Sequence, residues 1–470
     1  MTDLPDPAAL LADAPRVAES LQEAGWSSAA LDDLLGAGHR AHLDRDERSP
    51  LLRRTAGPSA LARLARALVV GGQVPTGTLP DSWVGPDGRA VVRLQAVAHG
   101  GNEVTVPHDP GSAAAEVHPD QVLGVGAASL TLAAATPRRV VGRVLDLGTG
   151  AGVQALLAED HAGVVVATDR NPRAVAYARL AAALNGAELD ARTGDLLEPV
   201  SGEAFDLVVS NPPFVISPHR RYTYRDAGYD GDGVCRRLVQ QIPSVLAPGG
   251  HAVLLVNWLH LTGEDGDARV RSWFDGTGCD GWVVQRELAA PEDYVTAWLR
   301  DTDETAFDSL YDPWVDALEG VDAVAFGVLA LHRRTDGRPP QVVLEDVEQA
   351  TAPTWGEEVL AHFARRDLLD ADLLEARLRL RDDVRLHQVA GRTAEGWMAD
   401  TLVLRQERGL RWDGGVDVYG ATLLAACDGT QRLGDLLAVL AASADLSVDE
   451  AAEQVLPVLR RLVQQGFLEG

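Results

Sequence analysis

Apolar runs alternate with helical stretches between residues 121 and 335, and this alternation limits the possible folds more than any other feature. The runs VGRVLDLG, VVVATD, FDLVVS and HAVLLVN are apolar almost throughout, as expected for strands buried on both faces. Helical stretches at 172–184 and 234–246 lie between them, and strands joined in this way form parallel sheets. With two later apolar runs, at 282–288 and 323–332, the pattern predicts an α/β fold with a doubly wound seven-stranded sheet.

The first 120 residues predict a separate α+β module. Helical patterns at 8–22 and 28–35 precede a third helix that begins after Ser59 and ends at the Gly71-Gly72 pair. Residues 89–107 then alternate in polarity around a Gly-Gly turn, which is typical of a β-hairpin. Helices followed by a hairpin also suit a winged-helix-like arrangement.

The last 130 residues predict a third, mostly helical module. The segment TDGRPP at 335–340 combines glycine and two prolines and is the best candidate for a domain boundary. Residues 341–470 contain several short helical patterns, a long one at 447–465 and a small terminal strand, which suggests a winged-helix-like module. The predicted domains are therefore 1–120, 121–335 and 341–470.

The first motif with chemical meaning is LDLGTGAG, which joins a predicted strand to a predicted helix. It contains Asp146, Gly148, Gly150 and Gly152. Glycines at such a junction permit a tight turn and allow a ligand to approach the backbone closely. The motif suits any nucleotide-type site, and it is also compatible with a simple turn.

Acidic residues lie near the ends of the next two predicted strands. A carboxylate at a strand end, such as Asp169, can accept hydrogen bonds from both hydroxyls of a ribose, and it can also cap the helix that begins at Asn171. In the segment GDLL, Asp195 is followed by Leu196. A carboxylate beside apolar residues can bind an adenine amino group and flank its ring, although an ordinary surface turn is the alternative.

The fourth motif, NPPF, places Asn211, Pro212, Pro213 and Phe214 directly after a buried strand. The two prolines lack N–H donors and stiffen the chain, so that the carbonyl groups of Asn211 and Pro212 point in fixed directions. A proline-rich loop without a role in chemistry is the alternative. The position at the carboxyl end of a strand favours a functional role.

Together the four motifs resemble those of the Rossmann-like S-adenosylmethionine-dependent methyltransferases, in the NPPF/NPPY branch. That branch includes adenine-N6, guanine-N2 ribosomal RNA and release-factor glutamine methyltransferases. The resemblance covers about residues 120–335 and implies S-adenosylmethionine as the cofactor. The cofactor-binding residues that it implies are Asp146, Gly148, Gly150, Gly152, Asp169, Asp195, Leu196 and Asn211.

The resemblance also implies catalytic roles for Asn211, Pro212 and Phe214. An amide or aryl amine nitrogen is a poor nucleophile because its lone pair is delocalised. The side-chain oxygen of Asn211 and the carbonyl of Pro212 can each accept one of its N–H bonds and favour localisation of the lone pair. Phe214 can stack on a planar acceptor, or it can pack beside the sheet. Such catalysis needs positioning and electrostatics but no metal.

The segment after NPPF, VISPHRRYTYRDAGYDGDG, is a long polar loop of the kind that often forms a lid. With Pro213, we expect Tyr222, Tyr224 and Arg225 to contact the substrate, because Tyr and Arg suit stacking and anion binding. An exposed loop with local salt bridges is an equal alternative. A helical insert at 291–320, which holds Tyr294, Trp298, Tyr311 and Trp314, is a further candidate for closing over a small acceptor.

The net charge of −27, from 42 basic and 69 acidic residues, bears on the acceptor. Phosphate neutralisation drives nucleic-acid affinity, so the acidity counts against a nucleic-acid acceptor. The sequence contains no lysine, and every basic contact is therefore an arginine. Between Arg48 and Arg66 lie five arginines and no acid, which predicts either a solvated helix face or a docking surface for an anionic partner.

Several acceptor classes remain open at this point. The first two are an exocyclic amine of a nucleobase, in RNA or DNA, and a glutamine-type amide of a protein. A small cationic amino acid or natural product is the third, because an acidic chain attracts cations. A catalytically inactive protein that uses the fold to bind partners is the alternative outside enzymology.

The sequence indicates a cytoplasmic protein without membrane or metal partners. The N-terminal residues have no basic signal region, and no run of about 20 apolar residues predicts a membrane span. The three cysteines, Cys235, Cys279 and Cys427, lie far apart without metal-ligand spacing. Such sparse cysteines fit a reducing compartment.

Overall fold

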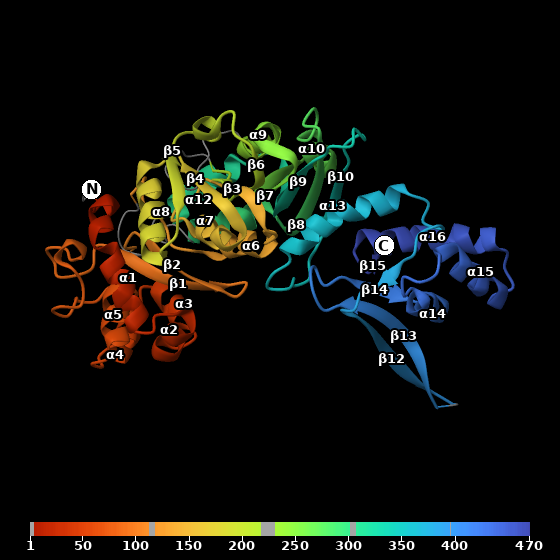
Figure 1. Ribbon diagram of the computed structural model, residues 1–470, viewed down its shortest axis with the longest axis horizontal. Helices are drawn as coiled ribbons and strands as arrows, with labels where there is room; N and C mark the ends of the chain where they lie inside the picture. Colours follow the sequence, from red (N-terminus) through yellow and green to blue (C-terminus); the bar gives the residue numbers. More distant parts are fainter. Residues whose placement is uncertain (1–3, 112–117, 218–230, 301–306, 395) are drawn as a thin grey trace. The chain divides into compact units, whose positions relative to one another are not determined.

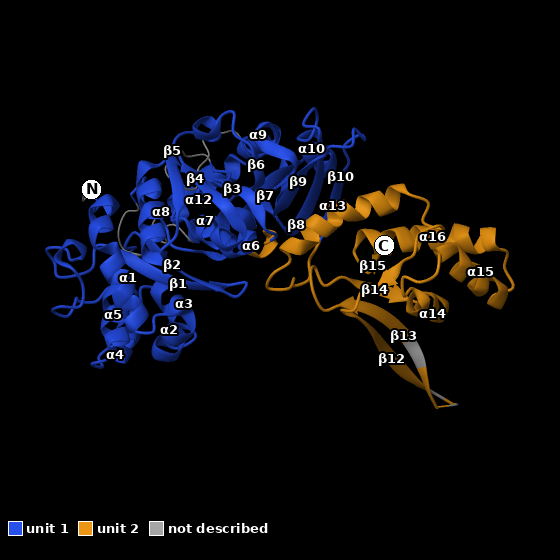
Figure 2. Cartoon of the chain, viewed as in Figure 1, with its two compact units in different colours: residues 1–133, 139–346 blue, residues 134–138, 347–470 orange. Residues whose placement is uncertain are grey.

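The computed structural model describes residues 4–111, 118–217, 231–300, 307–394 and 396–470 (Figure 1). The chain divides into two compact units, which Figure 2 colours separately. Unit 1 comprises residues 1–133 and 139–346, and unit 2 comprises residues 134–138 and 347–470. All four motifs lie in unit 1.

An eight-stranded sheet forms the centre of unit 1, and its spatial order is β10-β8-β9-β7-β6-β3-β4-β5. Strand β9 runs antiparallel to β7 and β8, and the other neighbouring pairs are parallel. The predicted α/β sheet is therefore confirmed. Its strands are β3 (Val141–Leu147), β4 (Ala162–Asp169), β5 (Leu189–Thr193), β6 (Phe205–Ser210), β7 (Leu246–Leu261), β8 (Cys279–Ala289), β9 (Val321–Arg333) and β10 (Val342–Asp346).

The prediction of seven strands is wrong by one, because β10 adds an eighth. This strand follows the expected boundary at 335–340 and pairs in parallel with β8, with Val342 opposite Gly281. It is short and mostly half-buried, and its Glu345 accepts a hydrogen bond from Trp282 Nε1 at 2.9 Å. Three apolar residues followed by two acidic ones show no clear periodicity, and the segment forms a strand because it covers the outer edge of β8.

Helices connect the parallel strands, and local sequence signals set their ends. Helix α8 (Pro172–Asn185) begins where the Asn171 side chain accepts a hydrogen bond from the backbone N–H of Arg173 at 3.0 Å. It ends at Gly186, which has a φ of 67°. The other helices of this part are α6 (Ala127–Ala135), α7 (Val153–Ala158), α9 (Gly233–Gln241), α10 (Gly266–Ser272), α11 (Pro291–Arg300) and α12 (Phe307–Asp316).

The helix expected at 234–246 is shorter than predicted. It ends at Gln241, and a 3-10 turn, η5 (Ile242–Ser244), follows. Pro243 causes this ending, because its ring nitrogen carries no hydrogen for an α-helical bond. The chain then enters β7 directly.

The N-terminal residues form helices and a hairpin, as expected for an α+β arrangement. The hairpin pairs β1 (Arg93–His99) with β2 (Asn102–His108), and Gly100 and Gly101 make the turn with positive φ angles. The helical elements are η1 (Pro7–Asp13), α1 (Ala14–Glu23), α2 (Ser28–Leu35), α3 (His39–Asp44), α4 (Arg48–Arg54), α5 (Ala60–Leu68) and η2 (Asp81–Trp83). Shorter 3-10 turns, η3 (Glu159–His161) and η4 (Glu198–Val200), lie among the sheet connections.

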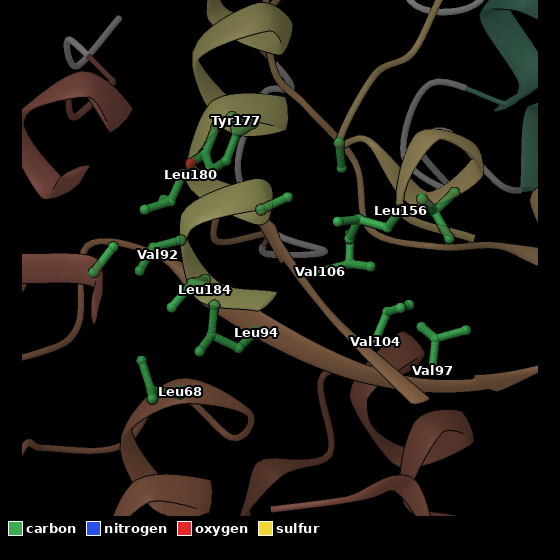
Figure 3. Close-up of a cluster of buried hydrophobic side chains, with 14 of the residues drawn as sticks. Leu68, Val92, Leu94, Val97, Val104, Val106, Leu156, Tyr177, Leu180 and Leu184 are labelled. Atoms are coloured by element: carbon green, nitrogen blue, oxygen red, sulfur yellow. The ribbon is translucent and has the colours of Figure 1, made fainter. Parts of the chain in front are cut away.

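One hydrophobic core joins the N-terminal elements to helices α7 and α8 (Figure 3). It includes Leu68 of α5, Leu94 of β1 and Val106 of β2, together with Leu156 of α7 and Leu180 of α8. Burial of apolar surface stabilises folded proteins in proportion to the area removed from water. The shared core therefore accounts for the inclusion of the N-terminal elements in unit 1, whereas the three-domain division stays a prediction.

The described residues of unit 2 form four helices, and they also form strands that the mostly helical prediction does not include. Strands β12 (Val384–Thr393) and β13 (Gly396–Gln406) form a long antiparallel hairpin, to which β14 (Asp413–Val416) is added. The small terminal strand that the sequence predicts is present as β15 (Leu468–Glu469), and it pairs with β11 (Arg379–Leu380). The winged-helix-like arrangement stays a prediction. The helices are α13 (Gly356–Asp370), α14 (Val418–Ala426), α15 (Leu433–Ser443) and α16 (Val448–Gln464).

Candidate functional site

The carboxyl ends of four neighbouring strands bring the motifs together. Leu147 at the end of β3 pairs with Thr168 of β4 on one side and with Ser210 of β6 on the other. Asp169, at the end of β4, pairs with Thr193 at the end of β5. In open α/β sheets, ligands bind outside the carboxyl ends of the strands. Each of the four motifs begins within two residues of such an end.

The glycine-rich loop after β3 turns sharply and leaves space in front of its first two glycines. Gly148, Gly150 and Gly152 have φ angles of 76°, 55° and 88°, which favour glycine. A Cβ atom at Gly148 or Gly150 would meet nothing within 4 Å, whereas one at Gly152 would lie 3.2 Å from the Cα of Ala178. The first two glycines thus border open space, and the third permits close packing of α7 on α8.

Asp146 lies beneath this loop and holds it in place. Its side chain is 1% exposed, and its Oδ2 accepts hydrogen bonds from Thr149 Oγ1 at 2.6 Å and from the backbone N–H of Ala155 at 3.0 Å. Burial raises the pKa of Asp146 to about 6, against the lowering effect of these two donors. The geometry gives Asp146 a role in shaping the loop; its predicted contact with the cofactor stays a prediction.

The raised pKa of Asp146 predicts a specific pH dependence of stability. A folded-state pKa above the unfolded one stabilises the fold at low pH, and this contribution is lost as the pH rises through about 6. Replacing Asp146 with Asn removes the titration. The free energy of unfolding of Asp146→Asn, relative to the natural chain, should therefore increase between about pH 4 and pH 7. Urea denaturation at several pH values measures it, with the exposed Asp275→Asn as control, and a difference independent of pH would contradict this account.

The Asp169 carboxylate stands at the next strand end and is partly engaged by the loop. Its Oδ2 accepts a hydrogen bond from the backbone N–H of Gly150 at 3.0 Å, and its Oδ1 accepts one from that of Asn171 at 2.8 Å. Burial raises the pKa of Asp169, whereas these donors lower it. Each carboxylate oxygen can accept a second hydrogen bond. The carboxylate can therefore order the loop and also bind two hydroxyl groups.

The segment after β5 is tied to the same place. The backbone N–H of Gly194 donates to the backbone carbonyl of Asp169 at 3.0 Å. Asp195 follows with an exposed side chain, and Leu196, which is half-buried, has a φ of 46°. The positive φ indicates a sharp turn directly beside Asp169. An exposed carboxylate and an apolar side chain thus stand next to the ribose candidate, as an adenine site would require.

The NPPF segment lies on the other side of the glycine-rich loop. Ser210 Oγ, one residue before Asn211, donates a hydrogen bond to the backbone carbonyl of Leu147 at 2.8 Å. Leu147 directly precedes Gly148. This hydrogen bond therefore joins the residue before the glycine-rich loop to the residue before the NPPF segment. Pro212 is buried, and Asn211 and Pro213 are half-buried.

Phe214 packs against the sheet in the structure. Its ring is 7% exposed, and its centroid lies 5.5 Å from that of Phe326 on β9. Two residues later, the backbone N–H of Ile216 donates to the Tyr294 hydroxyl of α11 at 2.9 Å. The aromatic insert therefore contacts the segment after NPPF. Stacking of Phe214 on an acceptor stays a prediction, and Tyr222, Tyr224 and Arg225 lie outside the described residues.

Phe326, which contacts Phe214, and Asn257 have no counterpart in the sequence prediction. Phe326 and Asn257 lie on β9 and β7, and they are directly opposite each other in the antiparallel pair. An asparagine at the end of the apolar run HAVLLVN was a usable signal for Asn257, because buried polar residues need partners. Nothing in the local sequence connects Phe326 to Phe214.

The residues at the strand ends fit S-adenosylmethionine. The open space at Gly148 and Gly150 admits a ligand close to the backbone, and Asp169 and Asp195 offer oxygen acceptors in the order that the resemblance implies. Within the described parts of the chain, no three His, Cys, Asp or Glu side chains gather as a metal site would require. Each helix there is also too short or too polar to cross a membrane.

Comparison with known families agrees with the predicted motifs. Residues 121–264 match the model of the methyltransferase small domain. Residues 23–107 and 360–470 match two families that are described as domains of unknown function (DUF7059 and DUF7782). The matched methyltransferase segment contains all four motifs.

Curated relatives match the same part of the chain. A release factor glutamine methyltransferase of Geobacter sulfurreducens is 37% identical over 30% of this chain and 53% of its own length. A ribosomal RNA small subunit methyltransferase C of Alcanivorax borkumensis is 35% identical over 25% of this chain and 32% of its own length. The chain spans about half the length of the glutamine methyltransferases that it matches.

A solved structure with similarity to this chain is that of a methyltransferase from Pyrococcus furiosus. It is 17% identical, covers 42% of this chain and 78% of its own, and has a TM-score of 0.27. The family match and the curated relatives both fall on the segment whose motifs predict this enzyme class. Residues 121–264 of the chain are therefore similar to the methyltransferase small domain, in agreement with the resemblance of the four motifs.

Proposed function

We propose that this chain is an S-adenosylmethionine-dependent N-methyltransferase that acts on a planar amide or nucleobase amine nitrogen. The observation that carries the proposal is the direct link between the two halves of the site. Ser210 Oγ donates a hydrogen bond to the backbone carbonyl of Leu147 at 2.8 Å. Asn211 and Gly148 are the residues that directly follow this hydrogen-bonded pair in the chain. This arrangement supports transfer between a ligand at the glycine-rich loop and an acceptor at NPPF.

S-adenosylmethionine, when bound, supplies a methyl group on a positively charged sulfur. Gly148 and Gly150 would leave room for its methionine part, Asp169 would accept hydrogen bonds from its ribose hydroxyls, and Asp195 with Leu196 would hold its adenine. The oxygen of Asn211 and the carbonyl of Pro212 would each accept one N–H of the acceptor. These bonds hold the nitrogen in line with the methyl group, and they stabilise the positive charge that develops on it.

The acceptor is proposed to be a nucleobase exocyclic amine or a glutamine-type amide, because the relatives' names include both chemistries. The Arg48–Arg66 stretch gives limited support to nucleic-acid docking. Arg48 forms an ion pair with Asp46 at 2.6 Å, and Arg66 donates to the backbone carbonyl of Leu52 at 2.9 Å. A small cationic acceptor and an inactive partner-binding protein remain the alternatives. We also propose a cytoplasmic location.

Radiolabelled methyl transfer tests the proposal. The purified chain is incubated with methyl-labelled S-adenosylmethionine and with RNA, DNA, protein and metabolite fractions from cells that lack its gene. The expected result is label in the RNA, DNA or protein fraction, and none with the Asn211→Ala variant. Label in the metabolite fraction alone would favour the small-molecule alternative. Absence of label in every fraction, from a chain that binds S-adenosylmethionine, would favour the inactive protein.

A further inference from the structure

Strand β7 extends well beyond the end of its neighbour β6. The last pair between them joins Ser210 to Leu254, but β7 continues to Leu261 and stays paired with β9. At about 3.3 Å per residue, a position three residues past Leu254 lies about 10 Å beyond the end of β6. This extension of β7 therefore continues past the end of β6, where Asn211 begins the NPPF segment.

Two backbone groups of this extension already have hydrogen-bond partners. The N–H of Leu259 donates to Asp232 Oδ2 at 3.2 Å, and Arg269 holds that carboxylate with bonds of 2.7 and 2.9 Å. The backbone of Asn257 forms a hydrogen bond with the Cys235 thiol. These contacts engage the backbone of Asn257 and of Leu259 with protein groups, so neither of these backbone groups needs a ligand.

The Asn257 side chain differs from this satisfied backbone. It is 2% exposed, and its Oδ1 has no hydrogen-bond partner among the described residues. Directly opposite residues of an antiparallel pair lie on the same face of a sheet, so Asn257 shares a face with Phe326. The Phe326 ring is the one that contacts Phe214 of NPPF, with centroids 5.5 Å apart. A buried carbonyl oxygen without a donor costs free energy unless a ligand supplies the donor.

We propose that Asn257 is a specificity-determining residue of the acceptor site, and that its Oδ1 accepts an N–H that does not belong to the methylated amino group. This inference rests on the proposed function. Side chains that cover the oxygen must move aside as the acceptor enters. The methylated nitrogen offers its two hydrogens to Asn211 and Pro212, so Asn257 requires a third donor on the same planar group.

That requirement selects among the planar nitrogen acceptors. A glutamine amide has no N–H besides those of its amino group. Adenine and cytosine carry an unprotonated ring nitrogen beside the amino group, which is an acceptor and not a donor. Guanine has a ring N–H directly adjacent to its 2-amino group. The unpartnered oxygen of Asn257 therefore favours the 2-amino group of guanine as the site of methylation.

Binding of two nucleosides to the full chain, loaded with S-adenosylhomocysteine, tests this inference by calorimetry. Guanosine presents the ring N–H, and 2-aminopurine riboside keeps the 2-amino group but has no hydrogen on that ring nitrogen. We expect guanosine to bind about 10- to 100-fold more tightly than 2-aminopurine riboside, which is the usual effect of leaving a buried acceptor unpaired. In Asn257→Leu, a variant of similar size, the two nucleosides should bind equally. Asn102→Leu, in the β1–β2 hairpin, is the matched control and should keep the preference.

Three outcomes would overturn the inference. The first is equal binding of both nucleosides to the natural chain, a result that depends on no variant and no change in folding. The second is an unchanged preference for guanosine in Asn257→Leu. The third is methylation of a protein amide by a chain that does not bind guanosine at millimolar concentration. That result rejects the guanine assignment but leaves the proposed N-methyltransferase function intact, whereas a chain without any methyl transfer would contradict both.

Discussion

Replacing Asn211 with alanine is expected to lower kcat for methyl transfer about 100- to 1,000-fold, the usual cost of removing one positioned polar group from a transition-state site. The side-chain oxygen of Asn211 holds one N–H of the acceptor and stabilises the charge that develops on its nitrogen. Affinity for S-adenosylmethionine should fall far less than kcat, because Gly148, Asp169 and Asp195 carry most of the proposed cofactor contacts and Asn211 contributes only one of them. Steady-state kinetics and calorimetry measure the two quantities separately.

The control for this variant is Asn102→Ala, which removes an asparagine side chain from the β1–β2 hairpin and should change neither quantity. Equal losses of transfer and of cofactor affinity in Asn211→Ala would show that the residue supports the fold of the site and does not hold the acceptor. Unchanged transfer would remove Asn211 from the mechanism altogether.

The second large effect is expected at Asp169. Hydrogen bonds to a charged acceptor contribute about 1.5–3 kcal/mol each, so Asp169→Ala should weaken binding of S-adenosylhomocysteine at least about 10- to 100-fold. The carboxylate binds the N–H groups of Gly150 and Asn171 at 3.0 and 2.8 Å, and a carboxylate can accept further hydrogen bonds from ribose hydroxyls. Titration calorimetry of the purified variant measures the dissociation constant.

A loss of affinity in Asp169→Ala has two causes that need to be separated, namely loss of the ribose contact and disorder of the glycine-rich loop. An analogue of S-adenosylhomocysteine that lacks one ribose hydroxyl separates them. It should bind less tightly than the parent compound to the natural chain, and equally to the variant. If the natural chain binds both compounds with the same affinity, Asp169 does not bind the ribose.

Much of the central sheet could be predicted from sequence because its strands are buried on both faces. The apolar runs of β3, β4, β6 and β7 are continuous, and such runs between helices are specific for parallel sheets. Strand β10 and the β12–β13 hairpin lack this signal. β10 is a short, half-buried edge strand that is specified by β8, and the hairpin carries exposed side chains such as Leu386 and Trp397. Without a buried face, neither has a clear period.

The candidate site divides in the same way. The positions of Asp169, Gly148 and Asn211 could be predicted, because each lies at or directly after the end of a strand and the ends of parallel strands meet at one edge of the sheet. The neighbourhood of Phe214 could not. Its contact with Phe326 depends on β9 entering the sheet in the antiparallel direction, and the position of Asn257 depends on how far β7 extends past β6. Both are properties of strand register, which sequence spacing does not contain.

The most direct test of the account is the identity of the methylated atom. Mass spectrometry of the product from the labelled transfer reaction, after digestion to single nucleosides or amino acids, locates the methyl group. The account predicts a methyl group on an exocyclic amine or side-chain amide nitrogen, and none when Asn211 is replaced by alanine. A methyl group on carbon or oxygen, or nitrogen methylation that Asn211→Ala leaves unchanged, would contradict the claim that Asn211 and Pro212 hold a planar nitrogen for methylation.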